Sequence, residues 1–489
     1  MSPEKNYPSE LATNDGNFHV VFLPLLCASH MMPLVCVARL FAARGVRSTI
    51  VTSSHTLPMF QDNINFDIAR GYPISFHTVN IPPWNGLAQI NVVRKPMEQA
   101  VRDLVPNCIF SDMFLTWTVD LADELKIPTL MFYPDSMFFH SVLYSLKVHY
   151  SSTIAKSEDG TFVVPNLPDK VTMKRPEVPD GVKLNTMFGD LIDAMFRSEK
   201  RSYGLVHNSF YEIEPAYADH MKKSVNGPKI WHIGPLFQFF NNNNSDCLTK
   251  TFVLEKPYMF TRLPGLSNMH ESLYWLDTQK PKSVIYACFG SMTTFPAAQI
   301  TEIALALEEC DQPFVWVVKK KDDNREEIDG LPEGFEERIM KANKGFIITE
   351  WAPQVEILQH FAVGRFFTHC GWGSVLEAVV AGVPLVTWPL TADHFENEKL
   401  VELLGIGVKV GAEVWNPDFD ITSPVIGKQM IVEAIAKLQD GSDMVEIIKR
   451  NLKELSMKAK RSVHKGGSSA NSLASLIEDI KAFRFTPKA

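Results

Sequence analysis

Residues 368–400 read THCGWGSVLEAVVAGVPLVTWPLTADHFENEKL. The apolar run at 375–382 fits a helix, and the apolar run that follows it fits a strand. Polar side chains recur at the joints, with His369 and Ser374 before the helix and Asp393 after the strand. A segment that only packed would show apolar periodicity and caps without them. The stretch therefore predicts an α/β unit that holds a ligand at its joints.

The alternation of strands and helices continues outward on both sides of this unit. In the second half of the chain it is carried by SVIYACFGSM, AQITEIALALEEC and FVWVV. In the first half it is carried by FHVVFLPLL, MMPLVCVARLFAARG, VRSTIVTS, NCIFSDMF, DLADELKIP and TLMFYPD. Strands that alternate with crossover helices build mostly parallel sheets. The predicted fold class is therefore α/β, with a doubly wound sheet in each half.

The chain of 489 residues is long enough for two domains, each with its own core. After KIWHIGPL the alternation stops, and an Asn run with a change of composition predicts a linker. We therefore expect, in order, a flexible tail at 1–17, an N-terminal domain at 18–240, a linker at 241–268, a C-terminal domain at 269–465, and a C-terminal helix at 466–489 that packs back on the N-terminal domain.

Charge and composition exclude several classes of protein. The formal net charge is -8, and no basic stripe is interleaved with aromatic residues, so a nucleic-acid partner is not expected. No apolar run reaches the roughly 18 residues of a membrane span, and the polar N-terminus lacks the apolar core of a secretory signal. The seven cysteines have no CxxC spacing, which favours reduced thiols. We expect a cytoplasmic monomer with small-molecule partners.

The turn HCGWGS predicts an anion site. It places Ser374 and the following backbone N–H groups at a helix N-terminus, where unpaired N–H groups and the helix dipole stabilise negative charge. Phosphate is the default ligand, and His369 and the Ser374 hydroxyl could add donors. The turn alone leaves a second interpretation open, in which Ser374 is a simple N-cap and His369 only packs beside it. A second turn with Gly290 and Ser291 could bring more backbone close to a phosphate.

Absent motifs narrow the chemistry. The first strand is followed by CASHMMP instead of GxGxxG, so an NAD-dependent oxidoreductase is disfavoured, and no GxxxxGK[ST] or GxSxG occurs. Asp418 and Asp420 imitate a metal-binding Asp-x-Asp pair, but they lie in a Pro-containing turn, which favours a solvated loop. We therefore expect no metal, and helix N-termini with neutral donors in its place.

His30 and Asp112 are candidate catalytic residues. Each follows or ends a predicted strand at the edge where a doubly wound sheet presents side chains into its crevice. A histidine suits a general base at neutral pH, and a carboxylate can orient it. From the residues alone, a structural role for each stays open.

These residues belong to a longer pattern. Residues 351–394, WAPQVEILQHFAVGRFFTHCGWGSVLEAVVAGVPLVTWPLTADH, resemble the 44-residue signature of plant secondary-product glycosyltransferases that use UDP-sugars. SDMF, NSFYEIEPAY, IGPL, LPEGFEER and KGGSS extend the resemblance over nearly the whole chain. It implies the GT-B fold, in which two Rossmann-like domains face each other, the C-terminal one holding the UDP-sugar and the N-terminal one the acceptor.

The resemblance also implies a role for each site residue. Trp351 would stack on uracil, Glu377 would accept from the ribose hydroxyls, and Asp393 with His394 would bind the hexose. The full donor site that it implies comprises Ser291, Trp351, Ala352, Gln354, His369, Trp372, Gly373, Ser374, Glu377, Asp393 and His394. His30 would be the base of an inverting displacement, and Asp112 would stabilise its imidazolium.

Three residues depart from the family pattern. Gly373 stands where members usually carry Asn, which removes a side-chain contact to the phosphate, and Ser29 replaces a glycine before the base. His394 stands where glucose users carry Gln, and His there is associated with galactose or, in some members, a pentose. The resemblance therefore implies UDP-galactose as co-substrate.

The acceptor is implied by the branch of the family that the chain resembles most. RSYGLVHNSFYEIEPAYADH and VWNPDFDITSPVI are most like the steroidal glycoalkaloid galactosyltransferases of nightshade plants. An apolar wall for a polycyclic acceptor could be supplied by Met31, Met32, Met137, Phe138, Phe139, Met187, Phe188 and Met195. Two alternatives stay open: a glucosyltransferase for a flavonoid or other phenol, and a non-catalytic nucleotide-sugar-binding protein.

Overall fold

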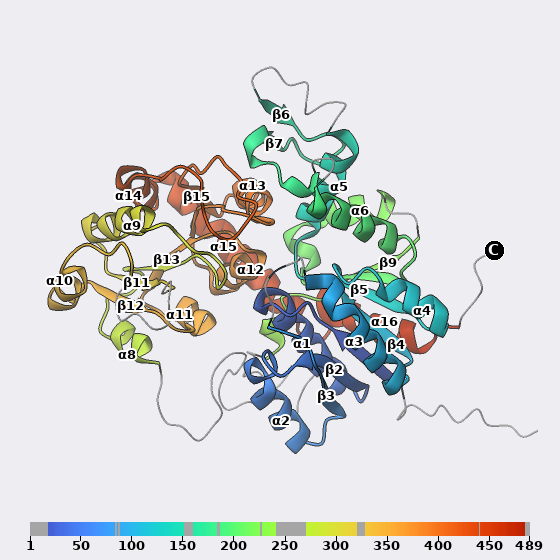
Figure 1. The fold of residues 1–489 in the computed structure, drawn as a ribbon. Coiled ribbons are helices and arrows are strands. Elements are labelled where there is room, and N and C mark those ends of the chain that lie inside the picture. Colours follow the sequence, from blue (N-terminus) through green and yellow to red (C-terminus); the bar gives the residue numbers. More distant parts are fainter. Residues whose placement is uncertain are drawn as a thin grey trace, which may run out of the picture.

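The chain folds into two α/β units that lie side by side (Figure 1). The structure is a computed structural model. The predicted tail at 1–17 and the predicted linker at 241–268 lie outside the residues that it describes. Those residues are 18–83, 86, 89–150, 160–182, 186–224, 227–240, 270–319, 328–439 and 441–484.

The N-terminal unit is built on a seven-stranded sheet in which every pairing is parallel. In spatial order its strands are β3 (Ile74–Val79), β2 (Arg47–Ser53), β1 (His19–Leu23), β4 (Cys108–Asp112), β5 (Thr129–Tyr133), β8 (Gly204–His207) and β9 (Lys229–His232). Strands such as β1 and β5 are buried along their whole length because helices cover both faces of the sheet, which is why they are continuously apolar instead of alternating.

Helices and short additions complete the N-terminal unit. Its α-helices are α1 (Ala28–Ala42), α2 (Gln61–Ala69), α3 (Ile90–Leu104), α4 (Thr118–Leu125), α5 (Met137–His149), α6 (Met187–Glu199) and α7 (Pro215–Ser224). An antiparallel hairpin, β6 (Thr161–Val163) and β7 (Thr172–Lys174), projects from the end that carries α5 (Figure 1). The described 3-10 helices are η2 (Leu57–Met59), η5 (Arg175–Glu177), η6 (Asp180–Val182), η7 (Tyr211–Ile213) and η8 (Leu236–Phe239).

The C-terminal unit repeats this plan with a six-stranded, fully parallel sheet. In spatial order its strands are β12 (Gly345–Ile348), β11 (Phe314–Val317), β10 (Val284–Cys288), β13 (Val363–Thr368), β14 (Leu385–Thr387) and β15 (Gly407–Lys409). Its helices are α8 (Glu271–Asp277), α9 (Ala297–Glu309), α10 (Phe335–Lys341), α11 (Gln354–Gln359), α12 (Trp372–Ala381), α13 (His394–Leu404), α14 (Lys428–Ala436) and α15 (Asp443–Ser462). The predicted α/β class with a doubly wound sheet in each half is therefore confirmed.

Strand order explains where a site can form. In both sheets the chain first winds outward from the first strand and then returns to the other side of it, so the order reverses between β1 and β4 and between β10 and β13. Ligands of open α/β sheets bind beyond the carboxyl ends of the strands at such a switch point. His30 follows β1 and Asp112 ends β4, while His369 follows β13.

The last helix, α16 (Ser468–Lys481), returns to the N-terminal unit and lies beside β9 (Figure 1). The Tyr203 hydroxyl donates to the Asp479 carbonyl at 3.2 Å, and Lys229 pairs with the Asp479 carboxylate at 3.0 Å. The Tyr203 ring also meets Phe483 edge to face, with ring centroids 5.2 Å apart. The chain therefore crosses between the units twice.

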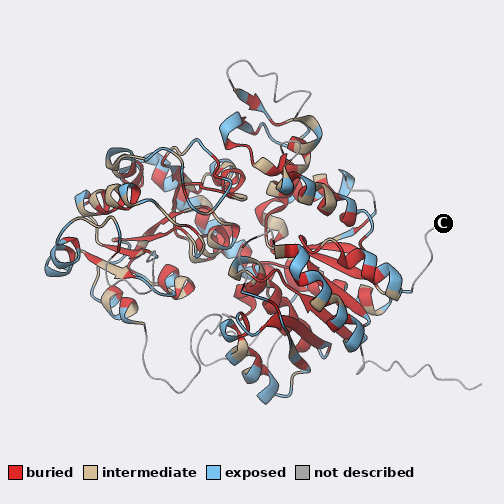
Figure 2. Cartoon of the chain, viewed as in Figure 1, coloured by how far each residue is buried: buried red, intermediate tan, exposed pale blue. Residues whose placement is uncertain are grey.

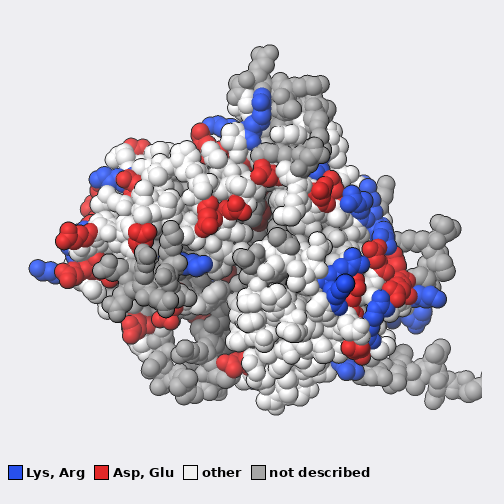
Figure 3. Space-filling model, in the orientation of Figure 1, with Lys and Arg blue, Asp and Glu red and all other residues white. Residues whose placement is uncertain are grey.

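Burial follows the two sheets (Figure 2), and the strands are the most uniformly buried elements. In the N-terminal core Phe22 stacks on Phe110, with ring centroids 5.3 Å apart, and meets Phe41 edge to face at 5.5 Å. Figure 3 shows charged side chains of both signs gathered over α3 and α4, where Arg201 pairs with Asp120 and Asp123. In the described part of the chain, no helix has the length and apolarity to cross a membrane.

Candidate active site

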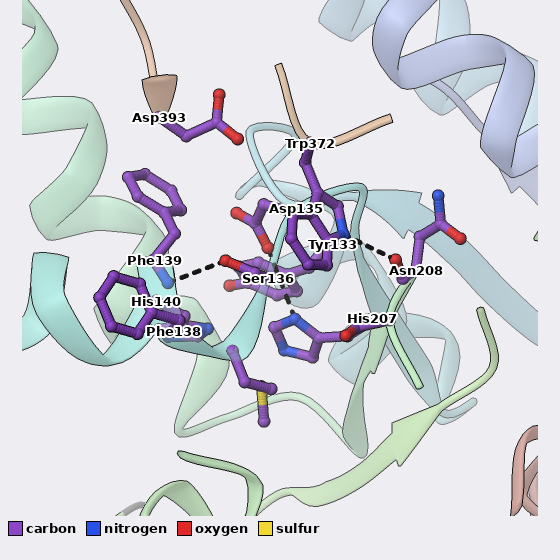
Figure 4. A network of polar contacts seen from close by, with 12 residues as sticks. Tyr133, Asp135, Ser136, Phe138, Phe139, His140, His207, Asn208, Trp372 and Asp393 are labelled. Atoms are coloured by element: carbon purple, nitrogen blue, oxygen red, sulfur yellow. Dashed lines mark hydrogen bonds and ion pairs between the residues drawn. The ribbon is translucent and has the colours of Figure 1, made fainter. Parts of the chain in front are cut away.

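A cleft of about 650 Å³ lies between the two domains. Its lining includes residues just beyond β1, β4 and β5 on one side and β10, β12 and β13 on the other. The carboxyl ends of both sheets therefore border one space. One hydrogen bond between the domains comes from Trp372 of α12, whose indole N–H donates to the Asn208 carbonyl at 2.8 Å (Figure 4).

His30 and Asp112 form a hydrogen-bonded pair on the N-terminal side of the cleft. His30 lies in the first turn of α1, and its Nδ1 is 2.8 Å from Asp112 Oδ2. Asp112 is fully buried, and its other oxygen accepts the Phe114 backbone N–H at 3.0 Å. Helix α1 begins at Ala28, not after His30 as the sequence suggested, so the histidine is fixed on a helix.

Electrostatics keep this imidazole basic. Burial alone would lower the pKa of His30, but the charge of Asp112 and the hydrogen bond to it outweigh burial and raise the pKa above 6.5. Asp135 and Asp393 add to the rise. The side chain of His30 is still 17% exposed, and His30 lines the cleft. The pair therefore has the geometry of a carboxylate-oriented base, with Nε2 left to take a proton.

A second hydrogen-bonded group lies on the C-terminal side. The Gln354 amide donates to Ser374 Oγ at 3.0 Å and to Glu377 Oε2 at 2.6 Å, and it accepts from the Tyr286 hydroxyl at 3.1 Å. Burial raises the pKa of Glu377 to about 7. Trp351, just beyond β12, lines the same region with 51% of its surface exposed. The predicted residues Trp351, Gln354, Ser374 and Glu377 thus come together.

The start of α12 differs from the prediction. The helix begins at Trp372 with Gly371 as N-cap, so Trp372, Gly373 and Ser374 form the first turn. The interpretation of Ser374 as the N-cap is therefore wrong. The helix starts earlier because Gly371 adopts a non-helical conformation, with φ -56° and ψ 137°, directly before it. The first-turn backbone N–H groups, which have no partner within a helix, and the Ser374 hydroxyl therefore lie at the helix N-terminus, where an anion is stabilised.

His369 packs closely between two glycine turns. A Cβ on Gly290 would lie 2.7 Å from His369 Nε2, and one on Gly371 would lie 2.6 Å from the same atom. Both positions therefore require glycine as long as the imidazole stays where it is. Burial lowers the pKa of His369 to about 4, so the ring is neutral. Ser291, beyond Gly290, is exposed and lines the cleft.

Asp393 and His394 begin α13. Asp393 is the N-cap residue, and its Oδ2 accepts from the Asn397 amide at 2.7 Å. Burial is the main cause that raises the pKa of Asp393, to about 6. His394 is buried, its Nδ1 accepts the Thr391 backbone N–H at 3.2 Å, and burial followed by His369 holds its pKa well below 6.5. A neutral ring whose Nδ1 accepts must carry its hydrogen on Nε2.

The predicted apolar wall is only partly correct. Met31, Met137 and Phe138 are completely buried in the core, and Met187 is 70% exposed, so none of the four lines the cleft. Adjacent residues of a helix point to different faces, so a residue can miss the cleft although the next residue in the sequence lines it. The predicted residues that do line it are Met32, Phe139, Phe188 and Met195. The sequence analysis missed other apolar lining residues, which include Leu25, Met113, Phe114, Leu143 and Ile192.

Two polar lining residues of the N-terminal domain were also missed. Asp135 follows β5, and Asn208 follows β8 (Figure 4). Both lie at the carboxyl ends of strands of the sheet that also positions His30 and Asp112. The rule that selected Asp112, a polar residue at the end of a predicted parallel strand, would have selected Asp135 in FYPDS as well.

Asp418 and Asp420 are exposed residues of a loop that pairs with Thr294. Their neighbour Phe419 lines the cleft, and neither carboxylate does. Among the described residues no group of three or more His, Cys, Asp or Glu side chains could hold a metal ion.

The chain is similar to known transferases over almost all of its length. Residues 268–418 match the family described as UDP-glucoronosyl and UDP-glucosyl transferase. Nuatigenin 3-beta-glucosyltransferase from Solanum aculeatissimum is 44% identical over 508 residues, which cover 96% of this chain and 98% of the relative. Solanidine UDP-glucose glucosyltransferase 1 from Solanum tuberosum is 40% identical over 502 residues, with 96% and 98% covered.

A solved structure shares the fold. UGT73P12 from Glycyrrhiza uralensis, complexed with glycyrrhetinic acid 3-O-monoglucuronide, matches with a TM-score of 0.84 and 34% sequence identity, and the match covers 95% of this chain and 96% of that chain. The two structures therefore share one fold, which in this chain consists of two parallel α/β domains.

Proposed function

Because the chain belongs to the plant UDP-dependent glycosyltransferases of GT-B fold, whose co-substrate is a UDP-sugar, we propose that it transfers a hexose to a steroid. The hexose is galactose, and the acceptor is a hydroxyl of a steroidal alkaloid or a related steroid or triterpenoid. The observation that carries this proposal is the His30–Asp112 pair, 2.8 Å apart, at the cleft between the two domains.

The reaction is a single displacement. His30 Nε2 removes the proton of the acceptor hydroxyl while the oxygen attacks the anomeric carbon, and Asp112 stabilises the imidazolium through Nδ1. The bond from the anomeric carbon to UDP breaks on the opposite face, and the electron pair leaves with the diphosphate. The anomeric centre is therefore inverted. First-turn N–H groups of α12 and the Ser374 hydroxyl balance the negative charge of the leaving group.

The nucleoside is held by the group around Gln354. The exposed indole of Trp351 offers a flat face to uracil, with Ala352 beside it. Glu377 accepts from ribose hydroxyls, and its hydrogen bond to Gln354 fixes the carboxylate in place. His369 and Ser291 lie next to the diphosphate, and Asp393 and His394 bind the hexose. Trp372 does not contact the donor in this proposal but joins the two domains through its hydrogen bond to the Asn208 carbonyl.

The side chains that line the cleft on the N-terminal domain are mainly apolar, which supports an apolar acceptor. Methionine and phenylalanine side chains adapt to a flat polycyclic ligand without demanding hydrogen bonds from it. The names of the similar transferases, which refer to nuatigenin and solanidine, support the same class. The side chains that would contact the acceptor are Met32, Met113, Phe114, Phe139, Phe188 and Met195.

The choice of hexose is tested by competition. In His394 the acceptor nitrogen already bonds the Thr391 N–H, so the ring offers the sugar one donor where a Gln amide offers a donor and an acceptor. We therefore expect wild type to prefer UDP-galactose over UDP-glucose when both are supplied with one steroid acceptor. An unpaired hydroxyl costs about 1–3 kcal/mol, which predicts a preference of about 5- to 150-fold.

His394→Gln should shift this ratio toward glucose, as measured by mass spectrometry with isotopically labelled donors. A second candidate is UDP-glucose, which the names of both similar transferases favour. Glucose-leaning products from the wild type would establish that candidate, and an unchanged ratio in His394→Gln would remove His394 as the determinant.

Gly373→Asn should tighten UDP binding. A Cβ at Gly373 would meet nothing within 4 Å, so an asparagine fits in the first turn of α12 without a clash. Its amide adds one neutral donor to the diphosphate site, and a hydrogen bond of about 1 kcal/mol predicts a Kd about fivefold lower. Calorimetry with UDP measures the change. Gly373→Ala is the control, because it adds the Cβ without the amide. Equal Kd values for wild type, Gly373→Asn and Gly373→Ala would contradict the placement of residue 373 beside the diphosphate.

A further inference from the structure

Asp135 is a carboxylate that the reaction described above does not use. It lies just beyond β5, next to β4 in the sheet, so its neighbours at the sheet edge are Asp112 on one side and His207 on the other. Asp135 is 5% exposed and lines the cleft. In Figure 4 it lies between Asp393, which comes from the opposite domain, and His207. The side chain is therefore directed into the space between the domains.

This carboxylate is poorly compensated. Its Oδ1 is buried on the side of His207, whose Nδ1 is 3.4 Å away, and it makes no hydrogen bond. Burial holds the pKa of His207 well below 6.5, so that ring is neutral and supplies no charge. Burial likewise raises the pKa of Asp135, to about 7. The carboxylate therefore lacks a good donor within its own domain, and the side of it that lines the cleft can take a donor from a ligand.

The facing wall carries a second carboxylate. Asp393 comes from the C-terminal domain, and the charge of Asp135 adds to the burial that raises the pKa of Asp393. The Asn397 amide donates to Asp393 Oδ2 at 2.7 Å, and Asp393 also lines the cleft. Two acidic groups that face each other need a ligand with several donors between them. A metal ion fits less well, since the described residues offer no cluster of three ligands.

We propose that Asp135 binds a hydroxyl of the transferred hexose, opposite Asp393, so that both domains select the sugar. This inference rests on the proposed function. A hydroxyl that donates to a carboxylate forms a strong, short hydrogen bond, and a hexose carries several such donors on different sides of its ring. The acceptor fits less well as the partner, because the residues that line its end of the cleft are mainly apolar. Asp135 would thus be a specificity-determining residue.

The test separates the sugar from the nucleotide. Calorimetry in EDTA compares UDP with UDP-galactose and UDP-glucose for wild type and Asp135→Asn, with exposed Asp62→Asn on α2 as matched control. Loss of a charged hydrogen bond predicts about tenfold weaker binding of the preferred UDP-hexose by Asp135→Asn. UDP itself should bind within about twofold of wild type. Asp135→Ala serves the same purpose if Asp135→Asn does not fold.

Deoxy donors identify the hydroxyl. UDP-hexoses that lack the 3-, 4- or 6-hydroxyl should each bind wild type more weakly if that hydroxyl is held. For the one bound by Asp135, the losses from the deoxy sugar and from Asp135→Asn should not add, because both remove the same contact. Additive losses at every position would overturn the proposal.

Other outcomes distinguish the two claims. If UDP and UDP-hexose lose affinity equally in Asp135→Asn, the residue is structural and the proposal is wrong. If only the KM of the steroid rises, Asp135 belongs to the acceptor site, and the proposal is again wrong. If wild type itself neither binds nor consumes a UDP-hexose, the proposed function fails, and the inference fails with it. Normal turnover with unchanged donor affinity in Asp135→Asn would overturn the inference alone.

Discussion

His30→Ala should lower kcat for sugar transfer by about 10²- to 10⁴-fold, the contribution expected of a positioned general base. The imidazole is the only group of the Asp112 pair that can reach a substrate, because Asp112 is fully buried behind it. Without it the acceptor hydroxyl must lose its proton to water. UDP binding should stay within about twofold of wild type, since the proposed diphosphate and nucleoside contacts come from the C-terminal domain.

Steady-state rates with a steroid acceptor and calorimetry with UDP measure the two effects. His55→Ala is the matched control, because His55 is exposed outside the cleft. A loss of UDP affinity comparable with the loss of rate would show that His30 has been assigned to the wrong end of the site. An unchanged rate would remove it as the base.

Asp112→Asn should lower kcat by about 10- to 10³-fold, less than loss of the base itself. The asparagine keeps a hydrogen-bonding group near Nδ1 but removes the charge that stabilises the imidazolium. It should also change the pH dependence. The base acts only when neutral, so kcat/KM falls as the pH falls through the pKa of His30.

In wild type this acid limb lies above pH 6.5, because Asp112 raises the pKa of His30 against the effect of burial. In Asp112→Asn burial acts without that charge, and the limb should move to lower pH. A pH profile of kcat/KM for both proteins tests the shift. A limb that stays in place, or one that moves to higher pH, would contradict the coupling of the two residues.

The fold could be predicted from sequence because the strands of a parallel sheet are buried on both faces and appear as short apolar runs between helices. That signal located β1, β4, β10 and β11. It also brought His30 and Asp112 to one sheet edge although they are 82 positions apart. Residues at strand ends are placed by topology, and topology follows from the order of elements.

Side chains on helices were harder to place. Met31 and Met32 are adjacent, yet Met31 is in the core and Met32 lines the cleft, because one residue of helix turns the side chain by about 100°. Composition alone does not give that rotation. The tautomer of His394 and the missing partner of Asp135 depend on single hydrogen bonds between distant segments. Such contacts appear only in three dimensions.

The most direct test of the account is the anomeric configuration of the product. Wild type should be incubated with an α-linked UDP-hexose and a steroid acceptor, and the anomeric proton of the glycoside should be examined by NMR. A single displacement driven by His30 predicts a β-glycoside and no other anomer. An α-glycoside would require a different mechanism, and consumption of the donor without any glycoside would contradict transfer to a steroid hydroxyl.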